Sequence, residues 1–197
     1  MKKIILVLVS LVCFNGFSQE EGKFRVGLDL GYVPASGGGG GLISLEPKYN
    51  IKDNMNVGLR LGAAGVVRDL ESNDNEEYTA KIAGIGSYVG TYDYYFDNSG
   101  GSFVPYVGGG LGYYSLSNVE VDDSESENET LDPAVSGVFG GLIRGGFEWS
   151  KLRVGIEYNF LPESDIENIN GDVVGVAKNA YLGIHIGFFV GGGKWGK

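Results

Sequence analysis

Apolar residues recur at every second position along most of the chain, and polar or small residues stand between them. In the stretch 179–190, for example, Ile184 and Ile186 alternate with His185 and Gly187. A period of two places successive side chains on opposite faces of a β-strand. The pattern therefore predicts strands that have one apolar face and one face of polar or small residues.

Eight stretches show this alternation, and we predict a strand for each. They are 23–33, 42–51, 55–67, 78–96, 103–114, 135–149, 153–161 and 179–190. Short turns follow the even-numbered strands, whereas polar loops of about eight to seventeen residues follow the odd-numbered ones. This asymmetry on an even number of strands is typical of a transmembrane barrel. We predict an all-β fold, an eight-stranded antiparallel transmembrane β-barrel with short periplasmic turns and long acidic outer loops.

The fourth stretch, 78–96, departs from strict alternation. Ile85 and Val89 fall on the same face as Ser87 and Asp93. Two explanations remain open at this point, because either a β-bulge or a few inward-facing apolar residues would produce this pattern.

The first residues have a different character, because Lys2 and Lys3 precede an apolar run at 4–14 and small residues at 16 and 18. These features predict a secretory signal peptide, 1–18, which is too short to be a spanning helix. We therefore assign 19–190 to the barrel and 191–197 to a short periplasmic tail. Cleavage would remove Cys13, the single cysteine, so we expect no disulfide in the exported protein.

Charged residues within the strands fall on the face opposite the apolar one, with six cations against five carboxylates. A barrel of eight strands is narrow, and side chains fill its interior. An unpaired buried charge costs several kcal/mol. We therefore predict an interior plugged by ion pairs and glycines. Its residues are Arg25, Asp29, Glu46, Lys48, Arg60, Lys81, Asp93, Arg144, Glu148, Arg153, Glu157 and His185.

A soluble barrel of the lipocalin kind is the competing prediction, because a period of two does not say which face is inside. In that fold the apolar face would line a ligand cavity and the charges would lie outside. Three observations favour the membrane barrel: the near balance of charge on the polar face, its many glycines, and the aromatic residues near strand ends.

Two motifs carry a resemblance to a known family. The stretch 103–113, Phe-Val-Pro-Tyr-Val-Gly-Gly-Gly-Leu-Gly-Tyr, resembles a phrase of small bacterial outer-membrane β-barrel proteins. That family includes OmpX, the OmpA membrane domain and many Bacteroidetes proteins. The strand end 185–190 resembles the signal that such proteins present to the insertion machinery, although Val190 stands where an aromatic residue is usual and seven residues follow it.

The resemblance implies a location in the bacterial cell outer membrane. It also implies a monomer whose partners are membrane lipid, lipopolysaccharide and the outer-membrane insertion machinery, with no nucleic acid. We expect a structural or surface-interaction role. The alternatives are a narrow channel for small or hydrophobic solutes and a component of secretion or envelope assembly.

Acidic residues gather in the long loops, where 68–77, 117–133 and 162–178 hold 16 of the 25 Asp and Glu residues. Such charge runs usually form a solvated surface. A sharper hypothesis is a Ca²⁺ or Mg²⁺ site shared with lipopolysaccharide phosphates, although no EF-hand spacing is present. Its ligands would be Asp122, Asp123, Glu125, Glu127 and Glu129.

Catalytic chemistry has little support in the sequence. His185 is the only histidine, and its position on the polar face predicts a structural place inside the barrel. The glycine run 37–41 lacks the Lys and Ser/Thr of a phosphate-binding loop. We therefore expect no cofactor and no enzyme activity.

Overall fold

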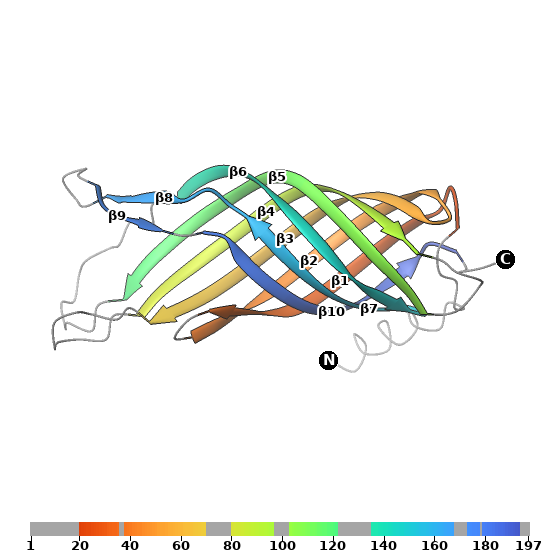
Figure 1. The fold of residues 1–197 in the computed structure, drawn as a ribbon, viewed down its shortest axis with the longest axis horizontal. Coiled ribbons are helices and arrows are strands. Elements are labelled where there is room, and N and C mark those ends of the chain that lie inside the picture. Colours follow the sequence, from red (N-terminus) through yellow and green to blue (C-terminus); the bar gives the residue numbers. More distant parts are fainter. Residues whose placement is uncertain are drawn as a thin grey trace, which may run out of the picture.

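A computed structural model of the chain describes residues 20–193, apart from 36–37, 70–79, 97–102, 122–134, 168–172 and 178. Eight strands form a closed antiparallel barrel (Figure 1). They are β1 (Phe24–Ala35), β2 (Gly38–Lys52), β3 (Met55–Asp69), β4 (Ala80–Tyr95), β5 (Phe103–Val121), β6 (Val135–Trp149), β7 (Leu152–Phe160) and β10 (Tyr181–Gly191). The predicted fold class is confirmed.

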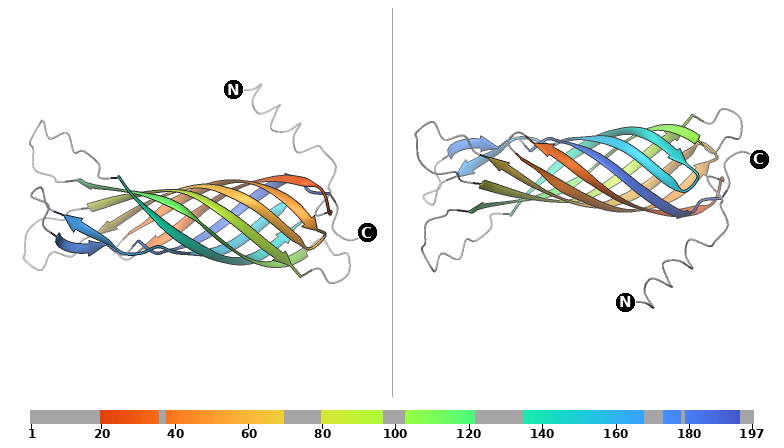
Figure 2. Two further views of the ribbon diagram at one scale, coloured as in Figure 1. Left: turned by 90° about the horizontal axis from the view of Figure 1, so that it is seen from above. Right: turned by 90° about the horizontal axis from the view of Figure 1, so that it is seen from below.

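Neighbouring barrel strands follow one another in the chain, in the order β1-β10-β7-β6-β5-β4-β3-β2. The first and last strands close the barrel through a continuous register from Arg25 opposite Gly191 to Tyr32 opposite Ile184. Both views in Figure 2 show the strands tilted around a common axis. β1 begins and β10 ends at the same end of the barrel, which is the end of the short turns.

Two features at the opposite end of the barrel were not predicted. The stretch 162–178 was read as loop, but it contains an antiparallel pair, β8 (Ser164–Glu167) and β9 (Val173–Ala177). In addition, β5 extends to Val121, seven residues beyond its predicted end. Backbone pairing there continues after the apolar alternation stops, since Asn118 still pairs with Ala83 of β4. The hydrophobic pattern alone therefore underestimates the length of this strand.

The irregular pattern of β4 is explained by inward-facing apolar side chains. Its pairing with β3 and with β5 runs without a register shift past Ile85 and Val89. Both side chains are buried inside the barrel. The alternative explanation, a bulge in this strand, is wrong.

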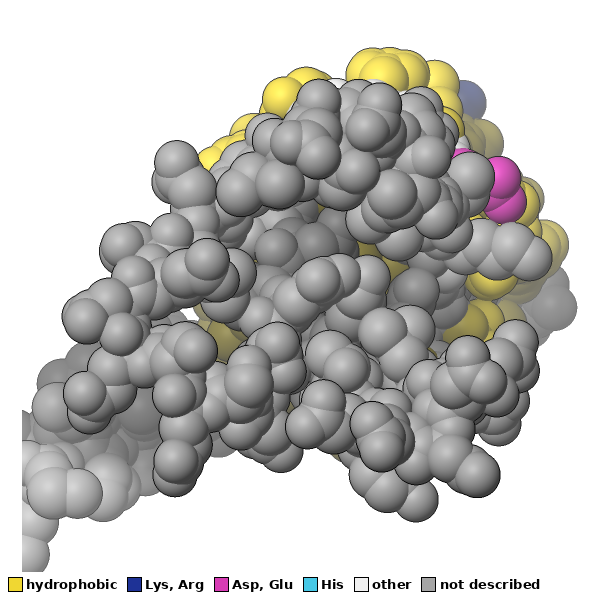
Figure 3. All heavy atoms as spheres, turned by 90° about the vertical axis from the view of Figure 1, so that its left-hand side faces the viewer, with side chains coloured by type: hydrophobic (Ala, Val, Ile, Leu, Met, Phe, Trp, Pro, Cys, Tyr) yellow, Lys and Arg dark blue, Asp and Glu magenta, His cyan; other side chains and the backbone are white. Residues whose placement is uncertain are grey.

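The outer wall of the barrel is apolar, and large side chains such as Leu111 and Phe139 are about two-thirds exposed, at 66% and 69%. Viewed from the loop end, hydrophobic side chains are visible along the upper and right-hand edges of the barrel (Figure 3). Glu46, Asp93 and Glu148, by contrast, are completely buried inside. This inside-out distribution contradicts the soluble, lipocalin-like alternative, because that fold needs an apolar interior and a polar exterior.

Aromatic side chains mark the turn end of the outer wall. The rings of Phe103 and Phe147 lie 4.9 Å apart, and those of Tyr94 and Phe96 lie 5.1 Å apart. Trp149 is exposed beside Phe103, its partner in the register of β5 and β6. Such a belt is typical of the level at which a barrel meets the polar boundary of a membrane.

No helix in the described part of the chain is long and apolar enough to cross a membrane.

Candidate functional site: the filled barrel interior

The turn-end half of the interior is organised around Arg144 of β6. Its guanidinium donates hydrogen bonds to Glu46 at 2.7 and 3.0 Å and to Asp93 at 2.8 and 2.9 Å. Glu46 lies on β2 and Asp93 on β4, so one side chain connects three strands that are not neighbours in the barrel. Paired, two-pronged bonds of this kind are among the strongest that arginine makes with carboxylates.

Glu148, near the turn end of β6, is the second centre of the network. Arg153 donates to it at 2.8 and 3.1 Å, and Arg25 of β1 forms an ion pair with it from the far side of the lumen. The Tyr95 hydroxyl donates to Glu148 at 3.0 Å and accepts a bond from Arg153 at 2.7 Å. Lys48 completes the cluster, with ion pairs to Asp93 and Glu46.

A separate ion pair lies nearer the middle of the barrel. Arg60 of β3 contacts Glu157 of β7 at 2.8 Å, again across the lumen. Asn159 donates to Glu157 at 3.0 Å and accepts a bond from the Tyr114 hydroxyl at 3.0 Å. Arg60 also donates to the Ser87 hydroxyl at 3.4 Å, so each charged group of this pair has at least one further polar contact, as buried charges require.

The charges of the described interior balance. The turn-end cluster has four cations for three carboxylates, since Arg25, Lys48, Arg144 and Arg153 surround Glu46, Asp93 and Glu148. Arg60 and Glu157 cancel, and Asp29 supplies the remaining negative charge. Asp29 accepts a 3.4 Å bond from Ser44 and lies 3.8 Å from Nδ1 of His185.

The structure thus places His185 and ten of the eleven charged residues predicted for the interior inside the barrel. The side chain of the eleventh, Lys81, lies outside the described residues.

Glycines make room for these large side chains. A Cβ added at Gly108 of β5 would collide with the Asp93 carboxylate, and one at Gly187 of β10 would collide with the Asp29 carboxylate. The inward glycines and the inward charges are therefore two parts of one arrangement, in which a side chain from one strand lies across the bare backbone of the next.

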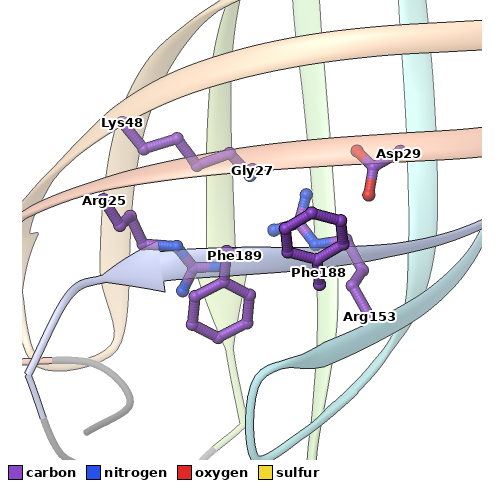
Figure 4. Close-up of a pocket in the computed structure, with 7 residues that line it drawn as sticks. All are labelled: Arg25, Gly27, Asp29, Lys48, Arg153, Phe188 and Phe189. Atoms are coloured by element: carbon purple, nitrogen blue, oxygen red, sulfur yellow. The ribbon is translucent and has the colours of Figure 1, made fainter. Parts of the chain in front are cut away.

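Aromatic rings close the turn end of the network. The Arg25 guanidinium carbon lies 3.6 Å from the centre of the Phe189 ring, and Lys151 lies 5.1 Å from the same centre. Figure 4 shows Arg25, Arg153 and Phe189 around the narrow space beside Asp29. Each of these cations is stabilised by the negative face of an aromatic ring or by a carboxylate.

An apolar layer fills the loop half of the interior, and of its residues only Ile85 and Val89 had been considered as inward-facing from the sequence. The signal was present, because these residues have the same parity as the charged positions of their strands. The layer comprises Val33, Leu42, Ala64, Val66, Ile85, Val89, Tyr114, Leu116, Leu142, Leu161 and Tyr181, all of them buried. The interior is therefore filled in two layers, one ionic and one apolar.

The hypothetical cation ligands in the acidic loop, at 122–129, lie outside the described residues. Within the described part of the chain, no group of three or more His, Cys, Asp and Glu side chains is arranged to hold a metal ion.

Comparison with known proteins agrees with this architecture. A family model described as the outer membrane protein beta-barrel domain matches residues 4–177. Among solved structures, Neisserial surface protein A is 16% identical, with a TM-score of 0.55 over 86% of this chain and 97% of that one. The outer membrane protein OprG from Pseudomonas aeruginosa is 13% identical, with a TM-score of 0.55 over 88% of this chain and 98% of that one. No curated protein sequence matches the chain.

Proposed function

Because the chain belongs to the family of outer-membrane β-barrel proteins, we propose that it is a sealed barrel with a structural or surface-interaction role. Its location is the bacterial outer membrane. On this proposal the barrel fixes the protein in the membrane as a monomer and carries the acidic loops on its outer side.

The observation that supports sealing is the direction of the ion pairs, which cross the lumen. Arg144 reaches from β6 to β2, Arg25 from β1 to β6, and Arg60 from β3 to β7. A conducting barrel keeps a continuous path of water between its walls, but here the charged ends of opposite walls meet at hydrogen-bond distance. The apolar layer adds a second barrier on the loop side.

Planar-bilayer recordings test this proposal directly. The purified protein should insert without producing conductance steps. A matched variant that removes two cations and two carboxylates together, Glu46→Ala, Lys48→Ala, Asp93→Ala and Arg144→Ala, keeps the charge balance while opening a gap. It should produce small steps, provided that its migration in unheated gels shows a folded barrel. Steps of similar size from the unaltered protein would overturn the sealed-barrel proposal.

The proposal also assigns no catalysis to the barrel. His185 is only 3% exposed and lies on the inner face of β10, so a lipid in the surrounding membrane does not reach its imidazole. His185→Ala should therefore leave the mass of lipid A unchanged in cells that produce the protein. A mass shift that appears with the unaltered protein and disappears with the variant would contradict this assignment.

A further inference from the structure

One row of inward positions crosses four strands and carries side chains only at its two ends. In the register, Tyr106 of β5 pairs with Gly146 of β6, Gly146 pairs with Gly155 of β7, and Gly155 pairs with His185 of β10. The two glycines form a floor of bare backbone. Tyr106 and His185 are therefore free to extend over this floor from opposite sides.

The polar ends of the two side chains converge above Gly155. A Cβ at Gly155 would lie 2.5 Å from the Tyr106 hydroxyl oxygen and 2.7 Å from Nε2 of His185. Both atoms thus face the same small region on the inner side of β7. The Arg153 guanidinium carbon, 4.7 Å from the centre of the Tyr106 ring, helps to hold the phenol in this orientation.

The Tyr106 hydroxyl and the His185 imidazole are deeply buried and lack hydrogen-bond partners among the described residues. Tyr106 is 1% exposed and His185 is 3% exposed. Among the described residues, neither the Tyr106 hydroxyl nor either imidazole nitrogen has a hydrogen-bond partner. Leaving such groups unsatisfied destabilises the fold, and a small ligand that bonds to the Tyr106 hydroxyl and to one imidazole nitrogen removes the cost for those two atoms.

We propose that a single water molecule binds between the Tyr106 hydroxyl and Nε2 of His185, above Gly155. Asp29 lies 3.8 Å from Nδ1 of His185, too far for a hydrogen bond. Its negative charge on this side still favours the neutral tautomer with the proton on Nδ1, so that Nε2 presents a lone pair. The water donates a hydrogen bond to Nε2 and accepts one from the Tyr106 hydroxyl. Two polar partners are the minimum that an internal water needs.

A high-resolution crystal structure of the protein tests the site. We expect one ordered water within hydrogen-bond distance of both atoms, and its absence after Gly155→Ala, since the added methyl group occupies the space beside both partners. A direct bond between the hydroxyl and the imidazole, or an empty site in the unaltered protein, would overturn the proposal.

A double-mutant cycle gives an independent measurement in solution, because two groups that share a water are coupled without touching. Tyr106→Phe should lower the folded-to-unfolded equilibrium constant about tenfold. The same change should have a smaller effect in a His185→Leu background. Tyr113→Phe, on the outward face of the same strand, is the matched control and should change little. Additive effects of the Tyr106 and His185 changes would count against a shared water.

Discussion

Arg144 and Asp93 are joined by two hydrogen bonds, 2.8 Å from Nε and 2.9 Å from Nη2, although strand β5 separates the strands that carry them. The bare backbone of Gly108 on β5 allows this contact, since Gly108 pairs with Arg144 on one side and with Asp93 on the other. Three positions on three strands therefore form one unit.

The first prediction concerns the charge in this unit. Arg144→Ala removes the four buried hydrogen bonds that Glu46 and Asp93 accept from its guanidinium, so it should lower the free energy of unfolding by about 3–5 kcal/mol. Urea titration of the detergent-refolded barrel measures the loss. Lys52→Ala, which removes an exposed cation at the end of β2, is the control and should cost less than about 1 kcal/mol. Equal losses in the two variants would mean that the buried network adds no stability.

The second prediction separates two classes of glycine. Gly108→Ala forces a methyl group against the Asp93 carboxylate and the Tyr92 carbonyl, so it should destabilise the barrel by about 1–3 kcal/mol. Gly65→Ala places its methyl group on the outer wall, where no atom lies within 4 Å. It should be neutral or stabilise the strand slightly. The same urea titration compares the two variants. An unchanged free energy of unfolding for Gly108→Ala would show that the interior can accommodate a further methyl group at this position.

The third prediction concerns the seam between β1 and β10. The Asn50 side-chain amide donates 3.0 Å bonds to the carbonyl oxygens of Glu20 and Gly192, which tie the chain before β1 to the chain after β10. Asn50→Ala removes both bonds and should cost about 1–3 kcal/mol. The temperature at which the folded band disappears in gel electrophoresis should fall, whereas Lys52→Ala should leave it in place. An unchanged temperature for Asn50→Ala would show that the seam holds without this tie.

The fourth prediction separates recognition by the insertion machinery from stability. Phe188 points outward from β10, within the stretch that resembles an assembly signal, and is 45% exposed; Phe160 points outward from β7 and is 49% exposed. Phe188→Ala should reduce the fraction of protein assembled in the outer membrane of cells more than Phe160→Ala does. The two purified variants should refold equally well in detergent. Equal assembly in cells would remove the role that we propose for this stretch.

Much of this architecture could be predicted from the sequence, because strand parity is a local property. Arg25, Arg144 and Glu148 fall on the inner face by simple alternation, and the structure has them buried. The partners could not be predicted. Arg60 and Glu157 are 97 residues apart in the chain, and only the tilt and stagger of the closed barrel bring them together.

The missed features have a physical explanation as well. Tyr106 and Phe189 have inward parity, but an aromatic residue in a membrane strand is expected on the outer face, so these rings were not recognised as part of the interior. The pair β8 and β9 lies in a stretch without sustained alternation of apolar and polar residues, since β8 is mostly polar and β9 is a short run of Val, Gly and Ala. Hydrophobic alternation predicts strands well where one face of the strand contacts lipid. It predicts strands less well in segments that do not contact lipid.

The apolar layer in the loop half of the barrel has a consequence for how the protein can change. It separates the ionic network from the loop ends of the strands. We therefore expect that foreign peptides can be inserted into the connections between β3 and β4 or between β5 and β6, because folding of the barrel depends on ion pairs on the other side of this layer.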